Sequence, residues 1–382
     1  MSLTHPRPAE LIESLGERAE ALCATLSPIG EEAELCGELE TWARALFPAV
    51  KRVKNSLVVW MDGVPLPPRG GGAAAHEGAI RPDRPLVLLA GHLDTVPIPE
   101  ADRGRQPRRE AGKLYGPGAS DMKSGVAVML EVAERLPRAA RFCDLALVLY
   151  AREEGPFVEN ELGDVLRSVP ELAGAALAIC PEPTDNQLQL GCMGSIHATL
   201  TFVGRSAHSA RPWQGENAIH RAGALLAELY GRPPRDARSG GHVFREVLSA
   251  TTIQGGRARN VIPDRCALNL NYRFAPDKTL EAASDELRAL AARHGAELEL
   301  IDLSPACPAY GDHPLVQRLL ARTGVRAEPK QAWTDVARLA AHGIPAVNFG
   351  PGATSQAHQQ GEWVELAALV KGYELLEKFL RL

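Results

Sequence analysis

Short, continuously apolar segments recur along the chain, and this pattern predicts strands that are buried on both faces. They lie at residues 56–61, 86–90, 145–151, 175–180 and 346–349. Segments with apolar residues at helical spacing alternate with them, at 8–24, 31–46, 122–136 and 363–380. The alternation predicts an α/β domain in which helices cover a mixed, mostly parallel sheet.

Between residues 192 and 305 the pattern changes to strands with one apolar and one polar face. Period-two alternation is clear in CALNLNYRF at 266–274. The predicted elements are a strand at 196–203, a helix at 217–230, strands at 248–253 and 266–274, a helix at 279–294 and a strand at 296–302. This β-α-β-β-α-β order is ferredoxin-like. We therefore expect an inserted α+β domain at 192–305, which separates two parts of a catalytic domain at 1–191 and 306–382.

The composition narrows the class of protein. Of the 382 residues, 45% are hydrophobic and 23% are charged, which excludes a wholly disordered chain. The net charge of −5 argues against a nucleic-acid partner. No run approaches the roughly 18 consecutive apolar residues of a membrane span, and no apolar leader indicates secretion. The seven cysteines are scattered and form no C-x-x-C pair, which favours a reducing cytoplasm and argues against a thiolate zinc site.

Charged and imidazole side chains follow the predicted buried strands. In chain order they are His92, Asp94, Asp121, Glu153, Glu154, Glu182 and His358. Asp121 differs from the others because it lies in the loop GPGASDMKSG, which opens a helix. Open α/β sheets gather ligands at the carboxyl ends of their strands, so we expect these side chains to meet at one edge of the sheet.

Each of these residues alone also has an ordinary structural interpretation. An isolated His-x-Asp is more often a hydrogen-bonded turn, an adjacent Glu-Glu pair is usually a solvated surface, and a single histidine is usually a core or surface residue. Their common position after predicted buried strands favours a metal site over these ordinary interpretations. Carboxylates crowded beside an apolar core repel one another unless cations neutralise them.

Imidazoles and carboxylates without sulfur form a ligand set that suits zinc, and manganese or cobalt would satisfy it too. The expected ligands of two such ions are His92, Asp121, Glu154, Glu182 and His358. Two divalent cations and one hydroxide would balance the three carboxylates, with Asp121 as the candidate bridge. Glu153 then remains to take a proton from an attacking water. Asp94 is placed to accept the second N–H of His92.

At these positions the sequence resembles the di-zinc aminoacylase and carboxypeptidase family of metallohydrolases. The matching segments are GHLDTVP at 91–97, GPGASDMKSG at 116–125, Glu153-Glu154, PEPT at 181–184 and AHQQGE at 357–362. The resemblance implies that His92, Asp121 and Glu182 hold one zinc ion. It implies that Asp121, Glu154 and His358 hold the other. It further implies Glu153 as the general base and Asp94 as the aspartate that orients the histidine.

The expected inserted domain carries further matches to the same family. GRSAHSARPWQGENAIH at 204–220 is similar to the segment whose histidine, here His208, helps to stabilise the oxyanion. Asn260 and Arg273 resemble substrate-contacting positions, and a guanidinium can pair with a substrate carboxylate through two hydrogen bonds. Because the family's inserted domain usually mediates dimerisation, the resemblance also implies a homodimer.

Within the family, the motifs are most similar to those of the actinobacterial-type desuccinylase branch. WTDVARL at 333–339 and GIPAVNFGPG at 343–352 contribute to this similarity. The reaction implied is hydrolysis of N-succinyl-LL-2,6-diaminopimelate to succinate and LL-2,6-diaminopimelate, a step of lysine and cell-wall precursor synthesis. Many desuccinylases have T-S-D-G-R-F where this chain has WTDVAR. The substrate pocket around Arg273, Thr334 and Gly352 is therefore expected to be built differently.

Three other functions stay open at the level of sequence. A related deacylase or peptidase, such as an acetylornithine deacetylase, an aminoacylase or a dipeptidase, would share the zinc site and differ in the pocket. A catalytically silent metal-binding protein is disfavoured, because Glu153 and every proposed ligand are present. A nucleotide site at the G-x-G of 116–118 lacks the third glycine of the dinucleotide motif. The expected partner is thus a small N-acyl amino acid substrate.

Overall fold

The chain folds into two compact units. The computed structural model describes residues 8–64, 84–102, 104 and 107–382. The many glycines and prolines of segment 63–85 predict a loop, and most of this segment lies outside the described residues. The first unit comprises Met1–Leu190, Tyr310–Glu328 and Arg338–Leu382, and the second comprises Gly191–Ala309 and Pro329–Ala337.

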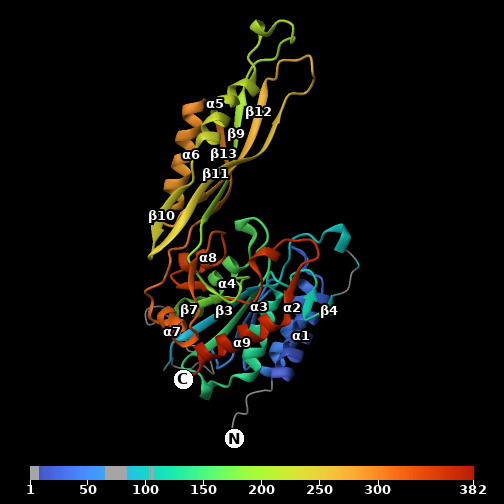
Figure 1. Cartoon of the computed structure of the whole chain (residues 1–382), viewed down its shortest axis with the longest axis vertical. Helices are drawn as coiled ribbons and strands as arrows, with labels where there is room; N and C mark the ends of the chain where they lie inside the picture. Colours follow the sequence, from blue (N-terminus) through green and yellow to red (C-terminus); the bar gives the residue numbers. More distant parts are fainter. Residues whose placement is uncertain (1–7, 65–83, 103, 105–106) are drawn as a thin grey trace. The chain divides into compact units, whose positions relative to one another are not determined.

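An eight-stranded sheet forms the centre of the first unit (Figure 1). Its strands are β1 (Ala49–Val53), β2 (Ser56–Trp60), β3 (Leu86–His92), β6 (Asp144–Tyr150), β7 (Ala175–Cys180), β8 (Leu188–Leu190), β14 (Ala327–Pro329) and β15 (Ala346–Asn348), in the order β1-β2-β6-β3-β7-β15-β8-β14. The four strands β6, β3, β7 and β15 run parallel to their neighbours within this group. Every residue of β2, β3 and β6 is buried, so the predicted two-sided burial is confirmed.

Helices cover this sheet. They are α1 (Pro8–Ala24), α2 (Ala33–Leu46), α3 (Lys123–Arg135), α4 (Leu162–Ser168), α7 (Pro314–Thr323), α8 (Val336–Ala341) and α9 (Leu366–Leu380). Helices α1, α3 and α9 pack against one another, and α3 also lies against β3, whereas α2 and α4 contact β1 and β2. A small separate sheet has the order β16-β5-β4, with β4 at Arg108–Glu110, β5 at Lys113–Tyr115 and β16 at Trp363–Glu365.

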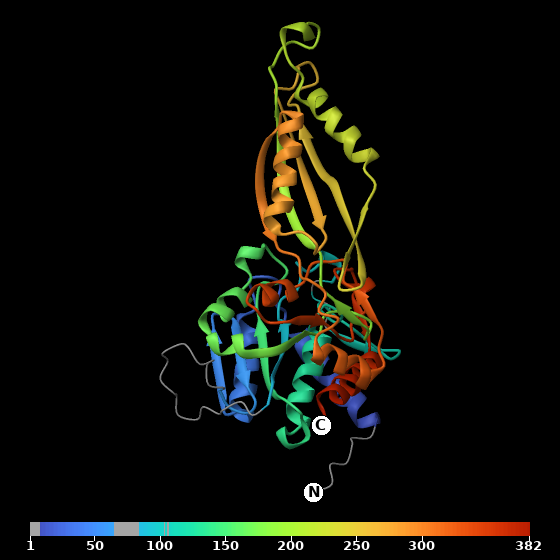
Figure 2. The same ribbon diagram turned by 90° about the vertical axis from the view of Figure 1, so that its left-hand side faces the viewer.

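The second unit is a five-stranded antiparallel sheet with two helices (Figure 2). Its elements are β9 (Gly194–Val203), α5 (Ala218–Gly231), β10 (Arg235–Ser239), β11 (His242–Gly255), β12 (Arg265–Phe274), α6 (Leu280–His294) and β13 (Glu297–Ser304), and the strand order is β10-β11-β12-β9-β13. One apolar core joins α5 and α6 to strands β9 and β12. The order β11-β12-β9-β13 with these helices is the expected ferredoxin-like arrangement.

Two features of the second unit differ from the sequence prediction. Strand β10 was not predicted, because its sequence RDARS buries only Ala237 and shows no apolar alternation. Residues 329–337 were assigned to the catalytic domain, yet they pack with the second unit. There, Trp333 Nε1 donates to Pro305 O at 3.0 Å, and the Gln331 side chain bonds the backbone of Val243 and Arg245.

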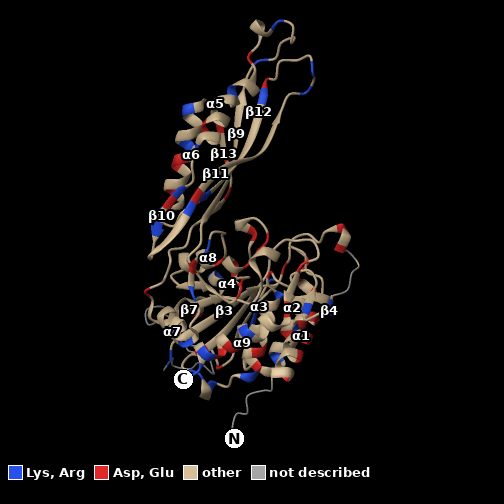
Figure 3. Ribbon diagram, viewed as in Figure 1, with Lys and Arg blue, Asp and Glu red and all other residues tan. Residues whose placement is uncertain are grey.

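The chemical character of the chain agrees with its composition. All seven cysteines are buried, and none of them forms a disulfide. Helix α1 carries mainly acidic side chains, whereas acidic and basic side chains are mixed along α9 (Figure 3). Among the described residues, no helix is both long enough and apolar enough to cross a membrane.

Candidate metal centre

The carboxyl ends of three parallel strands deliver acidic and imidazole groups to one edge of the sheet. His92 is the last residue of β3, Glu153 and Glu154 follow β6, and Glu182 follows β7. Strands β6, β3 and β7 are neighbours in this order, so the loops that follow them begin side by side. This is the position where open α/β sheets gather ligands.

The structure brings the five expected ligands into two overlapping groups. His92, Asp121 and Glu182 form one group, and Asp121, Glu154 and His358 form the other. Within each group the potential ligand atoms lie within 4.8 Å of one another. Asp121 belongs to both groups, as expected for a carboxylate that bridges two ions. A third group, of His92, Glu153 and Glu154, places the expected general base beside the same residues.

The donor atoms fit divalent cations. Nε2 of His92 is buried without a hydrogen-bond partner among the described residues, although it lies 3.4 Å from Asp121 Oδ1. Nε2 of His358 lies 3.0 Å from one Glu154 oxygen and 3.6 Å from Asp121 Oδ2. Two imidazole nitrogens facing three carboxylates are ligands of the kind that zinc accepts.

The charges of the site favour a cation there. Hydrogen bonding to Glu154 raises the pKa of His358 to about 9. Burial works against protonation of His92, but the nearby carboxylates of Asp121 and Asp94 outweigh that cost and raise its pKa well above the usual value. The carboxylates therefore attract positive charge, which protons on the imidazoles or metal ions can supply.

Asp94 fastens the segment that carries Glu153 and Glu154. Its two carboxylate oxygens accept the backbone N–H groups of Glu153 at 3.0 Å and Glu154 at 2.9 Å. Nδ1 of His92 lies closer to the Asp94 carbonyl oxygen, at 3.0 Å, than to the Asp94 carboxylate, at 3.6 Å. Sequence reasoning favoured the bond to the histidine over turn capping, and it did not identify these two N–H groups because such donors leave no mark in a residue pattern.

Gly352 permits a close approach between two loops of the site. A Cβ atom at this position would lie 2.2 Å from the carbonyl oxygen of Ser120, the residue before Asp121. Real Cβ atoms do not come so close, so glycine lets the two backbones touch. Gly352 is buried, and this packing explains the residue, while its contact with substrate stays a prediction.

His208 and Asn260 lie on neighbouring loops of the second unit. His208 forms a β-bridge with Val261, and Ser209 N donates to Asn260 O at 3.0 Å. Both residues are exposed. Nδ1 of His208 accepts the N–H of Ala210 at 3.1 Å, which leaves the proton of the neutral ring on Nε2. His208 can therefore offer an N–H donor to a ligand.

Arg273 and Thr334 also belong to the second unit. Arg273 lies near the end of β12, is half-buried, and lines a cavity of about 570 Å³ with Arg245 and Gln331. Its Nε donates to Asn271 Oδ1 at 3.0 Å, and burial lowers its pKa. Thr334 is buried, and its carbonyl oxygen accepts the N–H of Ala337 at the start of α8.

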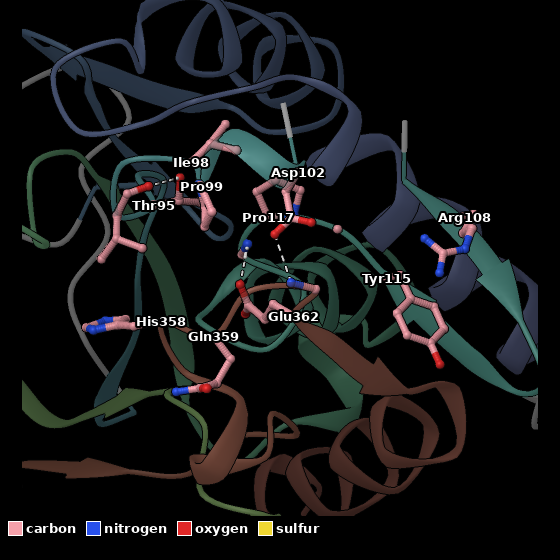
Figure 4. Close-up of a pocket in the computed structure, with 14 residues that line it drawn as sticks. Thr95, Ile98, Pro99, Asp102, Arg108, Tyr115, Pro117, His358, Gln359 and Glu362 are labelled. Carbon is pink, nitrogen blue, oxygen red and sulfur yellow. Dashed lines mark hydrogen bonds between the residues drawn. The ribbon is translucent and has the colours of Figure 1, made fainter. Parts of the chain in front are cut away.

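Sequence reasoning did not identify Glu362, which lies beside the expected ligand His358. Both residues line a cavity of about 180 Å³ in the first unit, together with Ile98, Asp102 and Tyr115 (Figure 4). Glu362 is buried and binds the loop that carries Asp121. The only sequence signal was its position four residues after His358 in AHQQGE.

Comparison with known sequences finds one family model, described as peptidase family M20/M25/M40, that matches residues 88–382. A putative succinyl-diaminopimelate desuccinylase of Mycobacterium tuberculosis is 37% identical over 365 residues, which cover 95% of this chain and 97% of the relative.

Solved structures share the fold. A tripeptidase from Staphylococcus aureus superposes with a TM-score of 0.75 at 19% identity and covers 97% of both chains. A peptidase from Bacillus subtilis, described as dinuclear and metal-binding, superposes with a TM-score of 0.65 at 16% identity and covers 97% of this chain and 98% of its own. At such identities these likenesses establish the architecture alone.

Proposed function

This chain belongs to peptidase family M20/M25/M40, and on that basis we propose that it hydrolyses N-succinyl-LL-2,6-diaminopimelate to succinate and LL-2,6-diaminopimelate. The product would serve lysine and cell-wall precursor synthesis. The observation that carries the proposal is the pair of ligand groups that share Asp121. The mycobacterial relative, matched over almost its whole length, supports the choice of substrate.

Two zinc ions are the proposed cofactors, with cobalt or manganese as substitutes. His92, Asp121 and Glu182 would hold one, and Asp121, Glu154 and His358 the other. Bound there, the ions would polarise the scissile carbonyl and lower the pKa of the attacking water.

Glu153 is the proposed proton carrier of the reaction. One of its carboxylate oxygens would take the proton from the attacking water and later give it to the departing amine. Asp94 would keep Glu153 in place through its bond to the backbone N–H. His208 would donate its Nε2–H to the oxygen on which negative charge develops.

Arg273 is the proposed partner of the succinyl carboxylate, with Asn260, Thr334 and Gly352 as further substrate-binding residues. An Arg273→Met variant should lose about 10- to 100-fold in kcat/KM on the succinyl substrate, the value of a hydrogen bond to a charged group. The loss should be small on N-acetyl-LL-2,6-diaminopimelate, which lacks that carboxylate. Arg265→Met is the matched control, because Arg265 lies on the same strand and donates to Thr201 Oγ1. Equal losses of Arg273→Met on both substrates would contradict the pairing.

The substrate is tested by amide hydrolysis with the zinc-loaded protein. N-succinyl-LL-2,6-diaminopimelate and N-acetylornithine are compared at equal concentrations, and we expect a large kcat/KM preference for the succinyl compound. Activity on the acetyl compound alone would keep the zinc mechanism and overturn the pathway. Activity on neither, in a protein that binds zinc, would overturn the proposed substrate. It would leave two alternatives, which are another acyl-amino acid or dipeptide as substrate and a catalytically silent site.

We also propose that the chain acts as a cytoplasmic homodimer that pairs through the second unit. The seven buried cysteines, none of which forms a disulfide, support a reducing compartment. Strand β13 lies at an edge of the second unit's sheet and exposes Ile301, which supports pairing there.

A further inference from the structure

Glu362 is a buried carboxylate that accepts three backbone N–H groups from one loop. Its Oε2 accepts from Gly118 at 2.8 Å (Figure 4). Its Oε1 accepts from Ser120 at 2.7 Å and from Asp121 at 2.8 Å. Hydrogen bonds from N–H groups to a carboxylate are shorter and stronger than those to a neutral oxygen. The loop that ends in Asp121 is therefore held from one side by the carboxyl group of a single side chain.

The position of this loop explains why it needs such a partner. It comes directly before α3, whose N-cap is Met122, so the N–H groups of this loop lie outside the helix and find no acceptor in its ladder. Ser120 is fully buried, so its N–H cannot turn to water instead. A negative charge is also favourable near a helix N-terminus. Glu362 thus supplies acceptors that this segment would otherwise lack.

The short segment 357–362, which contains Glu362, also carries His358. Several contacts fasten it to the part of the chain before Asp121: Gly361 N donates to Asp102 Oδ2 at 2.8 Å, Gly116 N donates to Glu362 O at 3.1 Å, and Trp363 pairs with Tyr115. The two expected ligands Asp121 and His358 are thereby attached to one another through Glu362.

We propose that Glu362 is a positioning residue that sets the spacing between Asp121 and His358 and so tunes the affinity of the metal pair. This inference rests on the metal site of the proposed function. The proposed role differs from a purely structural one. A residue that only satisfied the N–H groups of the loop would affect folding stability and leave the metal affinity of the folded protein unchanged.

The test compares zinc binding by the wild-type chain and a Glu362→Gln variant. Glutamine keeps the size of the side chain and one acceptor oxygen, but it turns an NH₂ group toward backbone N–H donors. Zinc is titrated into the metal-free protein against a competing chelator, and the absorption spectrum of bound Co²⁺ reports the ligand geometry. Loss of such a supporting contact typically costs about 10- to 100-fold in metal affinity, and we expect that loss together with an altered Co²⁺ spectrum.

The matched control is Asp62→Asn. Asp62 is also a buried carboxylate that accepts a backbone N–H, from Leu145 at 3.1 Å, and it pairs with Arg141 at 2.7 Å. It lies near the first residues of β6, whereas the expected ligands follow the other end of the strands. This control should lose folding stability and keep the zinc affinity and Co²⁺ spectrum of the wild type.

A folded Glu362→Gln protein with wild-type zinc affinity and Co²⁺ spectrum would overturn the inference. If that variant does not fold, Glu362→Asp replaces it, because it keeps the carboxylate and shortens its reach by one methylene. An affinity between wild type and the expected 10- to 100-fold loss would support the inference, and an unchanged affinity would overturn it. A wild-type chain that binds zinc but hydrolyses no acylated amino acid would overturn the proposed function alone.

Discussion

Replacing Glu153 with glutamine should lower kcat on the succinyl substrate by about 10²- to 10⁴-fold, the usual contribution of a positioned general acid or base. The amide cannot accept the proton from the attacking water, whereas the five expected ligands are unchanged. The zinc content of the variant, measured by mass spectrometry of the metal, should therefore equal that of the wild type. The thermal unfolding temperature serves as a check that the fold is intact.

The control for this experiment lies in the same segment. Glu159 is an exposed carboxylate that pairs with Arg152, so Glu159→Gln should retain wild-type kcat. A Glu153→Gln protein with near-normal kcat would remove Glu153 from the mechanism. Loss of zinc together with activity would instead identify Glu153 as a ligand, as its proximity to His92 and Glu154 allows.

Replacing Asp121 with alanine should remove most of the bound metal, because this carboxylate belongs to both ligand groups. We expect zinc to fall from about two ions per chain to well below one. Since the metal pair contributes several kcal/mol of transition-state stabilisation, kcat/KM should fall by about 10³-fold or more. Zinc content and initial rates on the succinyl substrate are measured on the same preparation.

Glu182→Ala provides the comparison, because Glu182 belongs to one group only. This variant should lose about one ion per chain and keep the other. If both variants lose the same amount of zinc, Asp121 is not shared between two ions. If Asp121→Ala retains both ions, the ligand assignment as a whole is wrong.

The sequence revealed the parts of the fold and the site that depend on residue pattern. The apolar segments that end near His92, Tyr150 and Cys180 were predicted as buried strands, and they coincide with the fully or largely buried strands β3, β6 and β7. A charged residue just after such a strand is costly unless it has a partner, so its position there was informative. The family motifs then led to the same residues that the structure brings into two overlapping groups, with the ligand atoms of each group within 4.8 Å of one another.

The features that sequence reasoning missed depend on the backbone. Glu362 acts through bonds to N–H groups, which every residue except proline carries, so no residue type marks the acceptor. Strand β10 is too polar to show a pattern, and it forms because β11 offers it a partner. Residues 329–337 join the second unit through contacts such as Trp333 with Pro305, which are distant in sequence.

His358 and Glu154 are separated by 204 positions along the chain, yet their side chains meet. An ion bound between them would act as a reversible cross-link that closes a very long loop. Because cross-links restrict the unfolded chain most when the loop is long, such an ion would stabilise the first unit as well as serve the reaction. The resistance of this protein to unfolding and proteolysis would then follow the metal supply of its surroundings.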